Sequence, residues 1–329
     1  MAKLHIIIIS PALAKANNGN WQTAHRWAQF LRTRYRVTLA SEWDGAQADL
    51  IIALHARRSA PSLAAFAHSW PSRPAILVLT GTDLYRDIRV DASAQESLRL
   101  ASELVILQEA GLDELDRLLR HKTRVIYQSA PALKPGVRND TARFADVTMI
   151  GHLREEKDPQ TFMRAAPLVR AARVRLTHIG AALDPALGAQ AEATQRQYPH
   201  YRWLGNQPHA ITRQILKRSR LLVITSTMEG GANVIIEAVT SGVPVLASDI
   251  AGNRGMLGND YAGYFPLGDS HALAELIDRA LTDPVFYDRL HAQSATRALL
   301  FSPDAERAAV LELVDNALNK TRNLHERTN

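Results

Sequence analysis

Short apolar runs alternate with helix-type segments along this 329-residue chain. The first run, Leu4–Ile9, is continuously apolar, as a parallel strand buried on both faces requires. A loop at Ala16–Asn20 and a helical stretch at Trp21–Tyr35 follow it. Further strand-like runs are Arg36–Ala40, Asp49–Leu54, Ala75–Thr80, Leu104–Gln108 and Arg124–Gln128. This alternation predicts a doubly wound parallel sheet.

A second series of the same kind follows an interruption at Ala130–Arg143, which holds Pro131, Pro135, Gly136 and a polar run. We interpret the interruption as a linker between domains. The later strand-like runs are Val147–Ile150, Arg173–Ile179, Tyr201–Leu204, Arg220–Thr225, Val243–Ala247 and Gly263–Pro266. The expected fold class is α/β, with two doubly wound Rossmann-like domains at 1–135 and 136–302. Because such sheets bind ligands at the carboxyl ends of their strands, we expect the site in a central cleft that the two domains face.

We expect the last helical stretch, Pro303–Lys320, to lie in a separate C-terminal segment at 303–329. Its apolar residues at helical spacing are Ala308, Leu311, Val314 and Leu318. A membrane-surface helix is the alternative interpretation. Four acidic residues argue against an anionic lipid surface: Asp304, Glu306, Glu312 and Asp315.

The composition excludes several classes of chemical site and of partner. The absence of cysteine excludes disulfides, thiolate metal sites and a cysteine nucleophile. No apolar run resembles a signal peptide or a membrane span, so we expect a cytoplasmic protein without stable membrane insertion. The net charge of +6 is spread along the chain without a basic block, and aromatic residues are few. We therefore expect no nucleic acid partner, and phosphorylated small molecules are the better candidates for a ligand of the basic surface.

The most informative segment is Ser226–Glu237, which follows an apolar strand, passes through two glycines and opens a helix. Gly230 and Gly231 let the backbone approach a ligand, and unpaired amides at a helix start favour an anion or sugar hydroxyls. Glu229 and Glu237 are carboxylates that can each accept hydrogen bonds from two vicinal hydroxyls. Helix capping plus a surface glutamate is the simpler alternative.

Several motifs in order resemble the retaining family-4 glycosyltransferases, which have the GT-B fold. Glu229 and Glu237 have the spacing of that family's Glu-x7-Glu signature, and Gly242-Val243-Pro244-Val245 matches the turn and strand that follow it. The resemblance covers roughly Asp146 to Ala298. It implies a nucleotide-sugar donor and a glycosyl-transfer activity. It also implies, as in GT-B folds, that the last helical stretch, Pro303–Lys320, crosses back onto the first domain.

The resemblance also assigns residues to the donor. Lys157 matches the lysine that holds the donor diphosphate, whereas His152 stands where the family has arginine. Arg154 is our candidate for the missing guanidinium, and two cations suffice to offset the charge of a leaving diphosphate. Ala232 and Asn233 depart from the family's usual residues beside the donor sugar. The expected donor-binding residues are Gly151, His152, Arg154, Lys157, Gly230, Gly231, Ala232, Asn233 and Glu237.

Polar residues at the strand ends of the first domain are the acceptor candidates, because they lie at the edge where ligands bind. They come from four stretches: the loop after the first strand, His55–Arg58, Thr80–Asp87 and the end of the last strand. The acceptor-binding candidates are Gly19, Asn20, Arg57, Arg58, Gly81, Thr82, Arg86 and Gln128. His55, Asp83 and Glu229 are the catalytic candidates, with His55 and Asp83 expected to orient the acceptor more than to deprotonate it.

These stretches together resemble the selenosugar synthase family of bacterial selenoneine biosynthesis. The matching residues include His55-Ala56-Arg57-Arg58, Thr80-Gly81-Thr82-Asp83, Gly151-His152-Leu153-Arg154 and Glu229-Gly230-Gly231-Ala232-Asn233. The resemblance implies UDP-N-acetylglucosamine as donor and selenophosphate as acceptor, with a 1-selenosugar, UDP and phosphate as products. It also implies upstream and downstream enzymes of that pathway as partners. We expect no cofactor and no metal, because no acidic pair suggests a metal site and the sequence has no Asp-x-Asp motif.

Three other functions stay open from the residues. One is a GT-B glycosyltransferase that acts on a saccharide or lipid acceptor, and another is a non-catalytic nucleotide-sugar binding protein. The third, a dinucleotide oxidoreductase, would need Gly-x-Gly-x-x-Gly after the first strand, where the loop Ser10–Asn20 has only Gly19.

Overall fold

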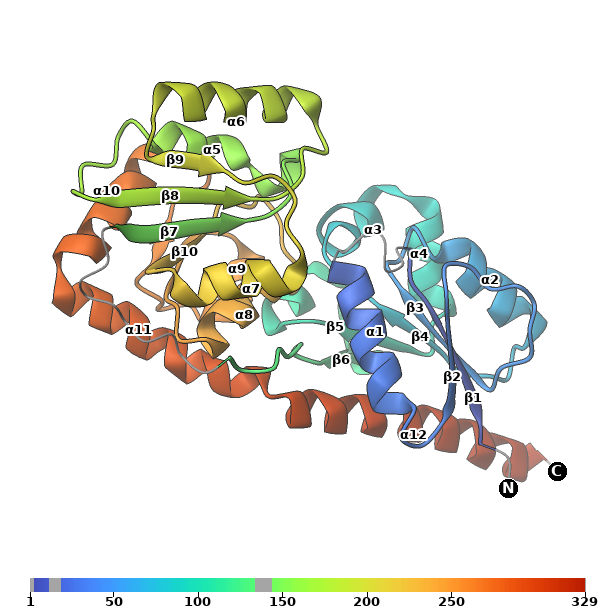
Figure 1. Ribbon diagram of the computed structural model, residues 1–329. Helices are drawn as coiled ribbons and strands as arrows, with labels where there is room; N and C mark the ends of the chain where they lie inside the picture. The colour runs from blue at the N-terminus through green and yellow to red at the C-terminus, as the bar shows by residue number, and fades with distance from the viewer. Residues whose placement is uncertain (1–2, 12–18, 134–143, 329) are drawn as a thin grey trace. The chain divides into compact units, whose positions relative to one another are not determined.

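The chain forms two compact units in a computed structural model that describes residues 3–11, 19–133 and 144–328 (Figure 1). Unit 1 comprises Met1–Ser129 together with Ser302–Asn329, and unit 2 comprises Ala130–Phe301. Each unit contains one six-stranded sheet in which every pairing is parallel. The expected class, two doubly wound α/β sheets in succession, is confirmed.

The sheet of unit 1 has the strand order β2-β1-β3-β4-β5-β6. Its strands are β1 (His5–Ile9), β2 (Arg36–Ala40), β3 (Leu50–Leu54), β4 (Ala75–Val78), β5 (Glu103–Ile106) and β6 (Thr123–Val125). The helices that connect them are α1 (Gly19–Leu31), α2 (Ala60–Ser69), η2 (Asp83–Asp87), α3 (Ile88–Val90), α4 (Ala92–Leu100), η3 (Glu109–Glu114) and η4 (Arg117–Lys122). All residues of β1 and β3 are buried, as their unbroken apolar sequences predict, whereas edge strand β2 is partly exposed.

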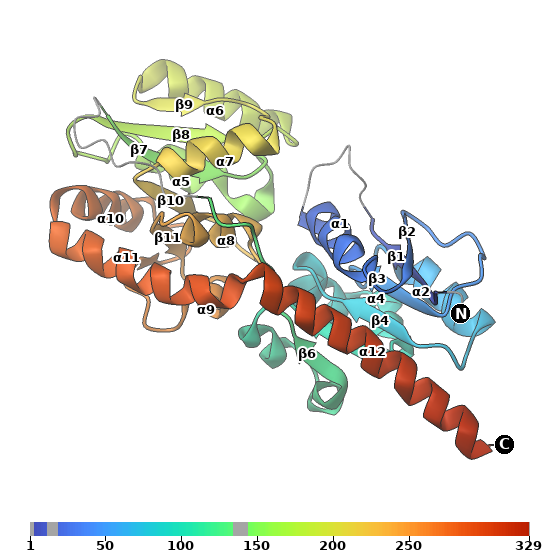
Figure 2. The ribbon, with the colours of Figure 1, turned by 60° about the horizontal axis from the view of Figure 1, so that its bottom comes forward.

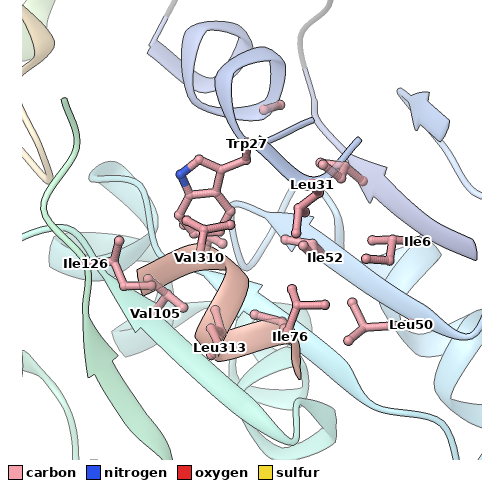
Figure 3. Packing of buried hydrophobic residues seen from close by; sticks show 14 of the residues in the cluster. Ile6, Trp27, Leu31, Leu50, Ile52, Ile76, Val105, Ile126, Val310 and Leu313 are labelled. Carbon is pink, nitrogen blue, oxygen red and sulfur yellow. The ribbon is translucent and has the colours of Figure 1, made fainter. Parts of the chain in front are cut away.

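Two hydrophobic clusters cover the two faces of this sheet because successive side chains of a strand point to opposite sides. Ile6 and Ile8 of β1 lie in one cluster, with Trp27 and Leu31 of α1. Ile7 and Ile9 lie in the other, which α2 and α4 complete. Figure 3 shows the first cluster, where residues of the C-terminal helix pack beside Trp27.

That helix, α12 (Pro303–Thr328), belongs to unit 1 (Figure 2). The buried residues it contributes are Val310, Leu313, Val314, Ala317 and Leu318. The predicted stripe was partly wrong, since Ala308 is exposed and Leu311 is only partly buried. The buried face of the helix keeps Val314 and Leu318 of the predicted stripe and adds Val310, Leu313 and Ala317. The carboxylate of Glu306 is buried on the same side.

The sheet of unit 2 has the order β12-β11-β10-β7-β8-β9. Its strands are β7 (Ala145–Ile150), β8 (Val174–Ile179), β9 (Tyr201–Trp203), β10 (Leu221–Ile224), β11 (Val245–Ser248) and β12 (Tyr264–Phe265). The helices of the unit are η5 (Glu155–Lys157), α5 (Pro159–Ala165), α6 (Pro185–Gln197), α7 (His209–Arg218), α8 (Asn233–Thr240), α9 (Ala251–Leu257), α10 (Ser270–Thr282), α11 (Pro284–Ala298) and η6 (Leu299–Phe301).

One predicted loop differs in the structure, and the predicted linker lies mostly outside the described residues. Gly19 and Asn20 were assigned to the loop after the first strand, but they are the first two residues of α1. Of the predicted linker Ala130–Arg143, residues 134–143 lie outside the described residues, and Ala130 belongs to unit 2. The strand ends that carry the candidate chemistry are all described: His55 follows β3, Thr80 follows β4, Gly151 follows β7 and Thr225 follows β10.

Candidate functional site

His55 lies in the turn directly after β3, in a conformation that few non-glycine residues adopt. Its φ angle is +75°, and its backbone N–H donates to Val78 O at 2.9 Å. The ring is buried between two turns. Its Nδ1 accepts a hydrogen bond from the N–H of Arg58 at 3.3 Å, and its Nε2 lies 3.2 Å from Thr82 Oγ1. An imidazole that accepts at Nδ1 carries its proton on Nε2 and is neutral.

The charges around His55 support the neutral ring. Burial lowers the pKa of His55, and the positive charges of Arg58 and Arg57 act in the same direction. The carboxylates Asp83 and Asp87 act against them, because they favour the charged imidazole. Both geometry and electrostatics therefore place the ring in one protonation state, with Nε2–H directed at the Thr82 hydroxyl.

Asp83 is fully buried, and it binds backbone amides with both carboxylate oxygens. Oδ2 accepts from Ala56 N at 2.9 Å, and Oδ1 accepts from Thr80 N at 2.9 Å and from Gly81 N at 2.8 Å. These bonds tie the turn after β3 to the turn after β4. The predicted catalytic role of Asp83 stays a prediction, and its contacts favour a residue that positions its neighbours.

Asp87, which the sequence interpretation left out of the site, joins two of the predicted acceptor arginines. Its Oδ2 accepts from Arg57 Nε at 2.9 Å, and its Oδ1 accepts from Arg86 Nε at 3.2 Å. The carboxylate is buried, while both arginine side chains are nearly half exposed. A single aspartate in a polar loop gives no sequence signal for this role, because such residues are typical of turns.

The remaining acceptor candidates fall into two groups. Arg58 is exposed beside His55, and Gly81 is buried next to Thr82, so both lie with the His55 turn. Gln128 is buried elsewhere: its Nε2 donates to Thr23 of α1, whose hydroxyl donates to Gly19 O at 2.9 Å. Gly19, Asn20 and Gln128 are thus brought together at the start of α1, and no hydrogen bond among the described residues joins them to Asp87 or His55.

In unit 2, the turn after β7 is held close to the neighbouring strand. A Cβ atom on Gly180 would lie 1.9 Å from the carbonyl oxygen of Gly151, so only glycine fits there. His178 Nε2 also lies 3.3 Å from the same oxygen, and its ring is completely buried. The sequence interpretation named His178 only as part of a strand end, and the structure shows that it supports the Gly151 turn.

His152 does not replace the family's arginine as a cation. Its Nδ1 accepts from Ala181 N at 3.1 Å, and burial lowers the pKa of the ring, as do the charges of Arg154 and Lys157. A neutral ring contributes no positive charge. Arg154, whose side chain is partly exposed and lies 3.9 Å from Glu156 Oε2, remains our candidate for the guanidinium.

Lys157 and Glu229 form an ion pair across two strand ends. Lys157 Nζ lies 2.5 Å from Glu229 Oε1, which also accepts from Ser226 Oγ at 2.6 Å. The backbone of Glu229 is confined as well, because a Cβ on Gly252 would lie 2.0 Å from its carbonyl oxygen. Lys157, predicted for the donor, and Glu229, predicted as catalytic, therefore share a single partly buried site.

The second glutamate of the signature, Glu237, has two basic neighbours on α7 that the sequence did not reveal. His209 Nε2 donates to Glu237 Oε1 at 2.6 Å, and Arg213 Nε lies 4.0 Å from the same oxygen. Glu237 lies in α8, whose start at Asn233 follows Ala232 in an extended conformation without a side-chain cap. Gly230 and Gly231 lead into this start, as predicted.

No group of three or more His, Asp or Glu side chains in 3–11, 19–133 and 144–328 has the arrangement to hold a metal ion. Across the same ranges, no helix combines the length and the apolar character needed to cross a membrane.

Comparison with known proteins agrees with the predicted fold and family. Residues 139–297 match the family model described as "Glycosyl transferases group 1". The chain is 28% identical over 157 residues to glycosyltransferase 1 domain-containing protein 1 of Xenopus tropicalis, a stretch that covers 47% of this chain and 45% of the relative. The chain thus matches less than half the length of this curated relative.

Two solved structures align with both units. Sucrose-phosphate synthase from Thermosynechococcus elongatus has a TM-score of 0.78 at 16% identity and covers 97% of this chain and 100% of its own. HepE from Anabaena, solved with UDP and glucose, has a TM-score of 0.75 at 16% identity and covers 96% and 100%. This protein has the GT-B fold, and its residues 139–297 are similar to the group 1 glycosyl transferases.

Proposed function

We propose that this chain is a selenosugar synthase, which transfers the sugar of a UDP-sugar to selenophosphate. UDP-N-acetylglucosamine is the expected donor. The bond between the anomeric carbon and the UDP oxygen breaks, and a carbon–selenium bond forms in its place. Water then cleaves the Se–P bond, so that the products are a 1-selenosugar, UDP and phosphate.

The donor half of the proposal is supported by the group 1 domain and by charge. Departure of UDP leaves negative charge on the diphosphate, and Lys157 with Arg154 supplies two cations near the Gly151 turn. Glu237 supplies a carboxylate for vicinal hydroxyls. HepE, which shares the fold, was solved with UDP and glucose.

The acceptor half rests on one observation: three arginines gather at the carboxyl edge of the unit 1 sheet, in the turns after β3 and β4. Arg57 and Arg86 both contact Asp87, and Arg58 is exposed beside His55. A neutral sugar hydroxyl would gain little from three guanidinium groups, whereas phosphate oxygens form charge-assisted hydrogen bonds with them. A small phosphorylated acceptor is therefore the better fit to this edge.

Attack on the anomeric carbon does not require a strong general base, because the selenium of selenophosphate is already a nucleophile. His55 is neutral, with its proton on Nε2, so it serves as a hydrogen-bond donor at this site. The protein's contribution is to hold the two substrates in line and to stabilise the leaving diphosphate.

The test is to incubate the purified chain with UDP-N-acetylglucosamine and selenophosphate in the presence of a chelator. Mass spectrometry and chromatography then follow the selenosugar and UDP, which we expect in equal amounts. Lys157→Ala should lower the rate by about 100-fold, because one cation at the leaving group is lost. Lys217→Ala, in the last turn of α7, is the control for the loss of a lysine charge.

Other outcomes point to different functions. Release of UDP with a saccharide or lipid acceptor, and none with selenophosphate, would replace the acceptor half of the proposal. Tight UDP binding without turnover of any acceptor would indicate a nucleotide-sugar binding protein.

A further inference from the structure

The hydroxyl of Thr82 has only one proton, and its direction follows from its neighbour. The Nδ1 atom of His55 faces the N–H of Arg58, a group that can only donate, so Nδ1 is an acceptor. The ring proton is then on Nε2, which lies 3.2 Å from Thr82 Oγ1. An oxygen that accepts this proton keeps its own hydrogen for another partner. Thr82 therefore presents a hydrogen-bond donor that His55 has oriented.

Asp87 orients two further donors, Arg57 from the turn after β3 and Arg86 from η2. Its two oxygens contact the Nε atoms of Arg57 and Arg86, one each, at 2.9 and 3.2 Å. A guanidinium has five N–H groups, so contact of Arg57 through Nε leaves its terminal amino groups with the capacity to bind an anion. Asp87 Oδ2 also lies 3.9 Å from His55 Nε2, so the side chains of Arg57, Arg86 and His55 all lie around one carboxylate.

The backbone beneath these groups is fixed independently of them. Asp83 binds the amides of Ala56, Thr80 and Gly81, so the turns that carry His55 and Thr82 have one relative arrangement. The hydroxyl of Ser59 donates to Leu54 O at 2.6 Å and closes the turn after β3. The polar groups thus lie on a rigid frame, which lowers the cost of ordering them around a ligand.

We propose that Asp87 and His55 are positioning residues of a preformed oxyanion site, in which Asp87 sets the guanidinium groups of Arg57 and Arg86 and His55 directs the Thr82 hydroxyl toward a tetrahedral oxyanion. The inference rests on the proposed function and specifies how its acceptor is recognised. It adds two roles that the acceptor residues alone do not explain. Asp87 contributes through the arginines, and His55 contributes through Thr82.

For Asp87→Asn, the expected change in phosphate affinity is opposite to the change that charge alone predicts. Asp87→Asn removes one negative charge from the cluster, so charge alone predicts tighter binding of an anion. If Asp87 acts by fixing the two guanidinium groups, binding weakens instead, because each arginine must then be ordered by the ligand. We expect the dissociation constant for inorganic phosphate to rise about 5- to 10-fold in Asp87→Asn, from the loss of orientation of two charged donors.

The experiment is calorimetric titration of the full chain and its variants with inorganic phosphate, at pH 7.5 as a chosen condition near neutrality. Thr82→Val, which keeps the shape and removes the hydroxyl, should weaken phosphate binding by about 10-fold, as expected for a hydrogen bond to a charged group. Thr82→Ser should bind phosphate at least about 5-fold more tightly than Thr82→Val. Arg57→Gln should weaken binding, whereas Arg89→Gln, which removes the same charge from an arginine paired with Glu114, should not.

The outcomes are distinct from those of the proposed function. Phosphate binding by Asp87→Asn that equals or exceeds that of the unmodified chain, with the same melting temperature, would overturn the inference. Equal affinities of Thr82→Val and Thr82→Ser would overturn it even if Asp87→Asn failed to fold. If the unmodified chain bound phosphate in this pattern but failed to bind UDP, the proposed function would fail and the oxyanion site would stand. If the unmodified chain bound UDP but not phosphate, the oxyanion site would fail and the proposed donor binding would stand.

Discussion

Burial lowers the pKa of three buried or partly buried histidines near the strand ends, so each ring is neutral at neutral pH. Nδ1 accepts a backbone N–H in both His55 and His152, and His178 contacts Gly151 O through Nε2 and the Tyr201 hydroxyl through Nδ1. Burial is the largest cause that lowers the pKa of each ring. Because an unfolded histidine has an ordinary pKa near 6.5, acid should favour the unfolded chain.

His178 allows a quantitative prediction, since burial lowers its pKa to about 4. Between pH 6.5 and about 4, the unfolded chain binds a proton at this ring that the folded chain does not, so stability falls as the pH falls. His178→Gln should be less stable than the unmodified chain at pH 7. The gap should shrink by about 2 kcal/mol on going from pH 7 to pH 5, because the glutamine does not titrate. Urea unfolding followed by circular dichroism measures the gap.

His271→Gln is the control for this effect, because that histidine is exposed at the start of α10 in the same unit. Its stability difference from the unmodified chain should be the same at both pH values. A gap for His178→Gln that stayed constant would show that the ring titrates normally in the folded state.

Sequence reasoning found individual site residues more readily than their partners. Lys157 and Glu229 came from a motif, but nothing in the sequence indicated that they form an ion pair across 72 positions. Asp87 was missed because its role depends on the convergence of two turns. His209 and Arg213 contact Glu237 from a separate helix, and the sequence gives that helix only an amphipathic pattern.

At the scale of elements, α12 shows how a polar residue can decide which face of a helix is buried. Glu306 lies at the start of the helix and is 2% exposed. Its carboxylate accepts from Arg26 Nε at 2.7 Å, Trp27 Nε1 at 2.8 Å, and the amide and hydroxyl of Ser129 at 2.7 and 2.5 Å. The sequence interpretation named Glu306 only as one of four acidic residues that argue against a lipid surface, because hydrophobic spacing alone does not reveal a carboxylate with this many donors.

Removing this charge should therefore destabilise unit 1. Glu306→Gln leaves Arg26 and Ser129 with donors that lose a charged acceptor, and one-sided loss of a buried ion pair costs about 3 kcal/mol. Urea unfolding followed by tryptophan fluorescence is the measurement, since Trp27 itself contacts the carboxylate. Glu312→Gln, an exposed glutamate of the same helix, is the matched control and should change stability by less than about 0.5 kcal/mol. Equal effects of the two substitutions would contradict the role assigned to Glu306.

At the scale of the whole molecule, the chain leaves unit 1 after Ser129 and re-enters it at Ser302. The alternation of strands and helices predicted both sheets, because continuous apolar runs such as β1 and β3 have few other structures available to them. The short helix α9 escaped prediction, because its seven residues are too few for a periodic signal. The crossing of the final helix back onto the first domain was expected from the resemblance to GT-B glycosyltransferases, and its apolar spacing predicted the buried face only in part.

This discontinuity means that the two units should respond differently to loss of the C-terminal segment. A chain that ends at Phe301 lacks five buried apolar side chains of the unit 1 core, namely Val310, Leu313, Val314, Ala317 and Leu318. Burial of one such side chain contributes about 1.5–3 kcal/mol, so their sum is comparable to the whole stability of a domain. Hydrogen exchange should show that the amides of β1 and β3 lose protection, while those of β7 and β10 keep it. A chain that ends at Thr321 retains these five residues and should protect both sheets, and equal protection in the shorter chain would mean that unit 1 folds without α12.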